Sequence, residues 1–254
     1  MSTVIAITNQ KGGVGKTNIT FNLSGALVEK DKRILLIDLD QQGNLSSAFL
    51  DNIYNLKSTV ADIFLDNGTP ISEVLQKTSF PNIDIIPSNI GLSKIDLQLA
   101  GEPDAQYFLT DKLKEVKDDY DYIIIDCPPS LSLATRIGLV ATDEVIIPLE
   151  CQEWAVKGTA YLRSAIAKIR KRANPKLKIM GYLINRFAGR RKLEEVYRDN
   201  ILESFKDKVF KVEFKNSVKY AEATTVRKPI TSYLPSSKQA KAYRRLAQEI
   251  LNHA

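Results

Sequence analysis

NQKGGVGKT, residues 9–17, lies between the apolar run VIAIT (4–8) and the helical pattern TNITFNLSGALVEK (17–30). The stretch nearly matches the phosphate-binding pattern G-x-x-x-x-G-K-[ST], with Gly15, Lys16 and Thr17 in their places. A strand, a glycine-rich turn and a helix in this order bring backbone N–H groups and the positive end of the helix to bound phosphates. The sequence therefore predicts a P-loop that opens an α/β fold.

The loop departs from the pattern at two adjacent positions. Gln10 stands where the pattern has its first glycine, and the next residue is a second lysine, Lys11. Two ammonium groups in one small loop repel each other unless several phosphate charges lie between them. The second lysine therefore indicates a loop that works chiefly with a polyphosphate nucleotide bound.

The remaining loop residues have predicted roles in phosphate binding. Gly12, Gly13 and Gly15 are expected to let the backbone approach the phosphates where a Cβ would obstruct it. Lys16 is expected to reach the β- and γ-phosphates, and the Thr17 hydroxyl is expected to bind Mg²⁺.

Three aspartates end two further apolar runs. ILLIDLDQQGN (34–44) supplies Asp38 and Asp40, and YIIIDCPPS (122–130) supplies Asp126. Carboxylates at the carboxyl ends of parallel strands point toward the crevice where such sheets bind ligands. One such aspartate is as compatible with a turn as with a ligand, but three beside a P-loop favour a magnesium–nucleotide site, with Asp126 as the partner of Mg²⁺.

Apolar runs alternate with helical patterns along most of the chain. Strands are predicted at 4–8, 34–38, 83–87, 122–126, 144–150 and 179–184. Helices are predicted near 16–30, 105–117, 131–141, 154–172, 190–206 and 237–252. Because the strands are continuously apolar and separated by helices, the pattern predicts a doubly wound, mostly parallel sheet flanked by helices. Without a convincing linker, residues 1–254 are interpreted as a single domain.

Charge is distributed unevenly between the two parts of the chain. Residues 1–150 carry 12 Lys and Arg against 21 Asp and Glu, whereas residues 151–254 carry 24 against 9. The balances of −9 and +15 suggest that the second part faces a polyanion.

Cys127 and Cys151 have no metal-binding spacing and are interpreted as buried thiols of a reducing cytoplasm. We expect no signal peptide and no membrane span.

The segments KGGVGKT, LLIDLDQQGN and YIIIDCPPS together resemble the deviant Walker ATPases, and specifically the ParA/Soj partition ATPases. The resemblance extends over the whole chain, because later segments are also similar: IPLECQEWAVKG (147–158), SVKYAEA (217–223), RKPI (227–230) and SKQAKAYRRLAQEIL (237–251). Within that family, the chain resembles the short forms, which lack an N-terminal helix-turn-helix domain. It implies a deviant P-loop NTPase with ATP and Mg²⁺ as cofactors.

The resemblance also implies residue roles. Lys11 would reach the phosphates held by the other subunit of a nucleotide-sandwich homodimer, and Asp40 would position the attacking water. The implied catalytic residues are Lys11, Lys16 and Asp40, and the implied Mg²⁺ site contains Thr17, Asp40 and Asp126. The implied nucleotide contacts are Lys11, Gly12, Gly13, Val14, Gly15, Lys16, Thr17 and Asn18, with Asn185 and Arg186 near the adenine. Departures from the family pattern lie at Gln41, at Phe214-Lys215, and at Arg186 and Ala188, and the last two leave the adenine contacts open.

By the same resemblance, the basic part would bind DNA through Arg190, which follows the strand at 179–184. The other candidates for phosphate contacts are Arg191, Lys219, Arg227 and Lys228. Because the region shows neither interleaved aromatic residues nor a recognition-helix pattern, we expect contacts without base readout. A simple ion pair of Arg190 with Glu194 is the alternative.

The sequence thus predicts a cytoplasmic, nucleoid-associated partition ATPase. Its ATP dimer would bind DNA non-specifically, and a DNA-bound adaptor of the ParB class would stimulate slow hydrolysis. The cargo, whether a plasmid, a chromosome or a protein assembly, stays open. Alternatives are a MinD-like membrane-surface ATPase, an iron–sulfur reductase like the nitrogenase iron protein, and a DNA-binding module with a structural nucleotide. The apolar stripe of the 237–252 helix is short and lacks Trp and Phe, which favours docking on the core over membrane association.

Overall fold

The computed structural model describes residues 2–65, 69–189 and 192–253. Its centre is a seven-stranded sheet in the order β3-β4-β2-β5-β1-β6-β7. The strands are β1 (Thr3–Ile7), β2 (Ile34–Asp38), β3 (Gln76–Lys77), β4 (Ile83–Ile86), β5 (Tyr122–Asp126), β6 (Glu144–Leu149) and β7 (Lys178–Ile184). Every pairing is parallel except that of β3 with β4. The predicted doubly wound, mostly parallel sheet is confirmed, and the prediction missed only the two-residue edge strand β3 among the described strands.

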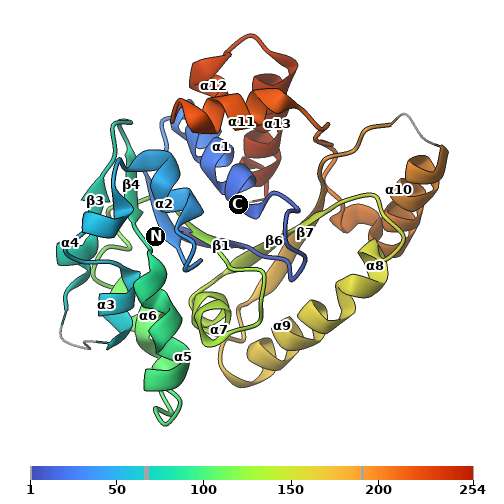
Figure 1. Ribbon diagram of the computed structural model, residues 1–254. Helices are drawn as coiled ribbons and strands as arrows, with labels where there is room; N and C mark the ends of the chain where they lie inside the picture. Colours follow the sequence, from blue (N-terminus) through green and yellow to red (C-terminus); the bar gives the residue numbers. More distant parts are fainter. Residues whose placement is uncertain (1, 66–68, 190–191, 254) are drawn as a thin grey trace.

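Helices cover both faces of the sheet (Figure 1). The longer ones are α1 (Lys16–Val28), α7 (Leu133–Val140), α9 (Ala160–Arg172), α10 (Lys192–Phe205), α11 (Val218–Thr225) and α13 (Lys238–Leu251). The shorter α-helices are α2 (Asn44–Phe49), α3 (Val60–Leu65), α4 (Ile71–Val74), α5 (Ile95–Gln98), α6 (Phe108–Leu113), α8 (Ala155–Gly158) and α12 (Ile230–Tyr233). The 3₁₀ turns are η1 (Ile53–Asn55), η2 (Ile90–Lys94), η3 (Ala105–Tyr107) and η4 (Lys206–Lys208).

The strands are buried on both faces, as their continuous apolar runs predict. In β1, Val4 and Ala6 pack into one core cluster with α3, α7 and α9, whereas Ile5 and Ile7 pack into a second cluster with α1 and α13. The same alternation holds in the neighbouring strands β2 and β5. Successive side chains of a strand point to opposite faces, so a sheet between two helical layers has no polar face.

The predicted helices are present, with two adjustments. The 105–117 prediction resolves into η3 and α6, and the 154–172 prediction into α8 and α9. The beginning of the 190–206 prediction lies outside the described residues, which resume at Lys192 in α10. Short helices such as α2, α3 and α4 were not predicted, because a segment of four to six residues shows little periodicity.

The helix α13 packs against α1, as the sequence favoured. Its apolar stripe is buried: Ala240, Tyr243, Leu246, Ala247 and Ile250. No helix among residues 2–65, 69–189 and 192–253 is long and apolar enough to cross a membrane.

Candidate nucleotide site

The P-loop joins β1 to α1 at the carboxyl edge of the sheet. Gly13 and Gly15 adopt φ angles of 76° and 90°, a region that L side chains rarely enter. A Cβ on Gly15 would also collide with the side-chain amide of Asn185. Gly12 is different, because a Cβ there would meet nothing within 4 Å. Within the chain itself, a side chain is therefore excluded at Gly15 but not at Gly12, and the predicted approach of all three glycines to phosphates stays a prediction.

A cleft of about 620 Å³ opens beside the loop. It is lined by residues of the P-loop, of the helices α1, α2 and α11, and of two loops: Gly12, Gly13, Gly15, Lys16, Thr17, Asn18, Phe21, Asp40, Gln42, Asn44, Ser47, Ala48, Pro129 and Thr224. The predicted residues Lys16, Thr17, Asn18 and Asp40 are thus brought together in one hollow. Lys11 does not line this cleft, although its neighbour Gly12 does.

Thr17 and Asp126 form the centre of the candidate magnesium site. The Thr17 hydroxyl donates to Asp126 Oδ2 at 2.6 Å. The other oxygen, Asp126 Oδ1, is buried and has no hydrogen-bond partner among the described residues. An unpartnered buried carboxylate oxygen beside a hydroxyl suits a hard cation. Within the described part of the chain, no group of three or more His, Cys, Asp or Glu side chains is arranged to hold a metal ion.

Three charged groups are buried around this point. Burial lowers the pKa of the Lys16 ammonium, and Asp126, Cys127 and Asp40 oppose that shift. Burial also raises the pKa of Asp126 well above its usual range, and the nearby Asp38 acts in the same direction. Asp38 and Asp126 are register partners on adjacent strands β2 and β5. The result is a carboxylate pair that favours a cation.

Asp38 ties the predicted catalytic loop to the core. Its Oδ1 accepts from the Asp40 backbone N–H at 3.0 Å, and its Oδ2 accepts from the Ser46 hydroxyl at 2.7 Å and the Ser46 N–H at 2.9 Å. The Ser46 hydroxyl oxygen in turn accepts from the Ser88 N–H at 2.8 Å. Asp40 itself is half-buried, and its Oδ1 accepts from the Gln42 N–H at 3.0 Å. Ser46 was missed in the sequence because nothing in its spacing from Asp38 marks it.

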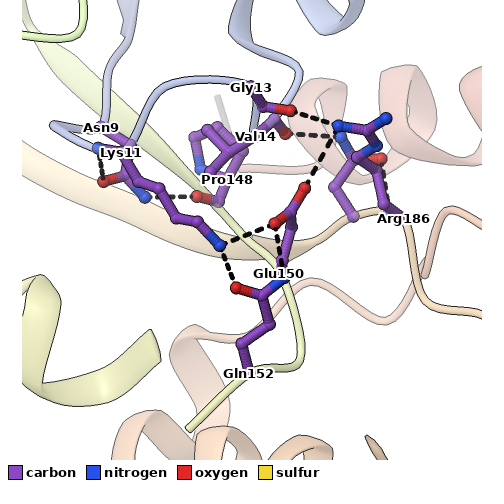
Figure 2. A network of polar contacts seen from close by, with 9 residues as sticks. Asn9, Lys11, Gly13, Val14, Pro148, Glu150, Gln152 and Arg186 are labelled. Carbon is purple, nitrogen blue, oxygen red and sulfur yellow. Dashed lines mark hydrogen bonds and ion pairs between the residues drawn. The ribbon is translucent and has the colours of Figure 1, made fainter. Parts of the chain in front are cut away.

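Lys11 lies in a polar network of its own (Figure 2). Its Nζ donates to Glu150 Oε2 at 2.7 Å and also to Gln152. The same Glu150 carboxylate lies 3.4 Å from the guanidinium of Arg186. Glu150 directly follows β6, so the rule that strand ends face the ligand crevice could have found it.

Asn185 and Arg186 brace the P-loop instead of standing free. The Asn185 amide donates to the Val14 carbonyl at 2.7 Å, and Arg186 Nη1 donates to the Gly13 carbonyl at 2.6 Å. Figure 2 shows the contact of Arg186 with Gly13. The predicted role of Asn185 and Arg186 at the adenine stays a prediction.

Asn18 connects the loop helix to α13. The Tyr243 hydroxyl lies 3.0 Å from Asn18 Oδ1.

Cys127 and Cys151 are both buried and free, and burial raises the pKa of each thiol to about 12.

Comparisons with known proteins agree with this geometry. The family model for the AAA domain matches residues 2–179. The chain is 39% identical over 251 residues to the chromosome-partitioning ATPase Soj of Treponema pallidum, covering 99% of this chain and 98% of that protein. It is 38% identical over 250 residues to the sporulation initiation inhibitor protein Soj of Bacillus subtilis, covering 98% of each.

The chain belongs to the ParA/Soj family of partition ATPases. A solved structure of cobyrinic acid a,c-diamide synthase from Mycobacterium smegmatis, with a bound ATP analog and magnesium, is also similar. It is 30% identical, with a TM-score of 0.87 over 100% of this chain and 96% of that chain. The ParA/Soj assignment confirms the resemblance stated from the P-loop and the two aspartate segments.

The structure of this ParA/Soj chain describes three of the five residues that are predicted to contact DNA. Arg190 and Arg191 lie outside the described residues. Lys219 pairs with Glu222 at 2.8 Å, and Arg227 pairs with Asp51. Lys228 is exposed and has no ion pair among the described residues.

Proposed function

We propose that this ParA/Soj-family chain is an ATP-dependent DNA-partition ATPase. In this proposal ATP and Mg²⁺ bind in the cleft beside the P-loop, and two copies of residues 1–254, each a single P-loop domain, then form a sandwich dimer. The observation that carries the nucleotide site is the unpartnered Oδ1 of Asp126 beside the Thr17 hydroxyl and the buried Lys16. When bound, Mg²⁺ would neutralise phosphate charge there.

Different residues of the chain have different roles in ATP hydrolysis. Backbone N–H groups from Gly12 to Thr17 bind the phosphates, with Val14 among them and Asn18 at the cleft wall. Lys16 supplies the closest positive charge, and its burial strengthens that attraction. Asp40, whose backbone is held by Asp38, orients the attacking water.

The dimer explains why the loop carries two lysines. Lys11 has a side chain that is 46% exposed and does not line the cleft of its own subunit. It is therefore free to approach phosphates held by a second copy once it leaves Glu150. We assign it to the partner's nucleotide.

The dimer would bind DNA without sequence preference and would be released when an adaptor of the ParB class stimulates hydrolysis. A dimer presents each basic residue twice, and this bivalence supports DNA binding only with ATP. We place the protein in the cytoplasm on nucleoid DNA, with a plasmid, chromosome or protein assembly as cargo.

DNA binding measured with ATP, with ADP and without nucleotide tests the proposal. We expect binding only with ATP and Mg²⁺, and we expect Lys16→Ala to abolish both ATP binding and DNA binding. Equal DNA affinity in all three states, or wild-type ATP turnover in Lys16→Ala, would overturn it. Flotation with anionic liposomes and ATP separates the proposal from a membrane-surface ATPase.

A further inference from the structure

A second groove, outside the nucleotide cleft, lies between α7 and α9. The two helices are neighbours on the sheet face opposite α1 and α13 (Figure 1). The groove has a volume of about 370 Å³, and Leu131, Leu139 and Ile169 give it an apolar floor. A further hollow of about 430 Å³ shares Leu131 and Arg136 with it, so the groove continues along the amino-terminal end of α7.

The rim of the groove is positively charged. Arg136, Lys168 and Arg172 line it, all three are exposed, and none has an ion pair among the described residues. Among the described residues no carboxylate lines this groove, although Asp96 and Glu102 line the adjoining hollow. The surrounding stretch, residues 151–180, carries 8 Lys and Arg against a single acidic residue. The occupant that complements this rim is an anion.

The floor distinguishes between two anionic occupants. The phosphates of a nucleic-acid backbone pair with cations and have no apolar surface that would complement the floor. A protein segment with acidic residues on one side and apolar residues on the other matches both the rim and the floor. Tyr161, a residue that is 67% exposed, adds an amphipathic contact at the edge.

The helix α7 connects this groove to the nucleotide site. Its inner side packs so closely that a Cβ on Gly138 would lie 2.7 Å from Leu39 and 3.7 Å from the Cys127 sulfur. Leu39 separates Asp38 from Asp40, and Cys127 follows Asp126. A densely packed contact transmits a displacement instead of absorbing it.

We propose that the groove between α7 and α9 binds an acidic, amphipathic segment of a partner protein. Its occupancy is transmitted through α7 to the loops that carry Asp40 and Asp126. The binding site stands on the groove alone, whereas the effect on hydrolysis rests on the proposed function.

The binding test uses a fluorescein-labelled helical peptide with glutamates on one face and leucines on the other. Fluorescence anisotropy is measured without nucleotide, so that the result does not depend on ATPase activity. We expect saturable binding that Lys168→Glu weakens about tenfold or more, as for a close charge pair at an interface. Lys171→Glu is the matched control, because Lys171 lies on the same helix, is exposed and lines neither groove nor hollow. We expect it to bind the peptide like the parent.

A second variant blocks the groove without changing its charge. Ala165 is half-buried in the lining, and Ala165→Trp should fill the space and abolish peptide binding. Absence of saturable binding, or equal weakening by Lys168→Glu and Lys171→Glu, would overturn the site. Displacement of the peptide by duplex DNA, with DNA affinity lost in Lys168→Glu, would assign the surface to nucleic acid instead.

The coupling is tested separately by ATP turnover. Saturating peptide should change the turnover of the parent and of Lys171→Glu but not of Ala165→Trp, in which peptide binding is abolished. Peptide binding without any change in turnover would overturn the coupling alone. Failure of ATP turnover in the parent itself would count against the proposed function and would leave the binding result standing.

Discussion

The ammonium of Lys11 lies 2.7 Å from the carboxylate of Glu150 in the same subunit. The contact holds the second lysine of the P-loop away from the cleft that its neighbours line. Any contact between Lys11 and a partner's nucleotide must therefore replace this intrachain pair.

Replacing Glu150 with Gln should favour the ATP-bound dimer. The variant removes the charge that holds Lys11 but keeps a side chain of similar size. Because an exposed ion pair contributes about 0.2–1 kcal/mol and a symmetric dimer would break two such pairs, the dimer dissociation constant should fall by up to about thirtyfold. Sedimentation equilibrium with ATP and Mg²⁺ measures it. A weaker dimer would show that Glu150 is needed within the dimer itself.

Lys11→Ala should separate nucleotide binding from dimerisation. Lys16 stays in place, so calorimetry should find ATP affinity close to that of the parent. Size-exclusion chromatography with light scattering should find a monomer under ATP, because the cross-subunit contact is lost. Lys11→Arg is the control that keeps the charge. An ATP dimer of normal strength in Lys11→Ala would refute the cross-subunit role.

Asp40→Ala should trap the protein on DNA. The carboxylate contributes to the transition state more than to nucleotide binding, so turnover should fall about 10²-fold or more while the dimer survives. Phosphate release and DNA-retention assays check the two parts. Turnover equal to that of the parent would mean that another residue positions the attacking water.

DNA affinity should depend more on Lys228 than on Lys219. Lys228 is exposed without an ion pair among the described residues, whereas Lys219 is paired with Glu222. Charge reversal at Lys228 should therefore weaken binding more, with ATP-dependent dimerisation unchanged. Arg190→Glu should abolish DNA binding, because the family resemblance assigns Arg190 to DNA contact. The parent should lose affinity with salt at a log–log slope of about −0.9 per phosphate neutralised, and indifference to salt would move the DNA surface elsewhere.

Stability should fall as the pH rises from about 4 to about 6. Burial raises the pKa of Asp38 from 3.8 to about 6, against the opposing hydrogen bonds from Ser46. A raised acid pKa means that the folded state binds more protons than the unfolded state in that interval, so ionisation costs folding free energy. Urea unfolding at several pH values should show this slope, and Asp38→Asn should flatten it. An identical slope in the variant would assign the dependence to other groups.

The sequence predicted the sheet well because its strands are buried on both faces and each reads as one apolar run. It predicted the cleft residues Lys16 and Thr17 because the P-loop pattern fixes their spacing, and it predicted Asp126, which lies beside Thr17, because this residue ends a buried strand. It missed the intrachain contacts of Lys11 and Asn185, since both depend on the sheet order in which β6 lies beside β1 and β7 lies beside β6. Short elements such as α2 and β3 escaped because tertiary packing, not periodicity, decides them.

The hydrogen bond from Tyr243 to Asn18 spans 225 positions of the chain. The helix α1, which begins in the P-loop, is covered by α13. During translation, α13 is synthesised much later than α1. Contacts of such high sequence separation form late, because a long loop must close first. During synthesis the apolar side of α1 therefore stays uncovered, and the nucleotide site matures only when the carboxyl-terminal helix has emerged.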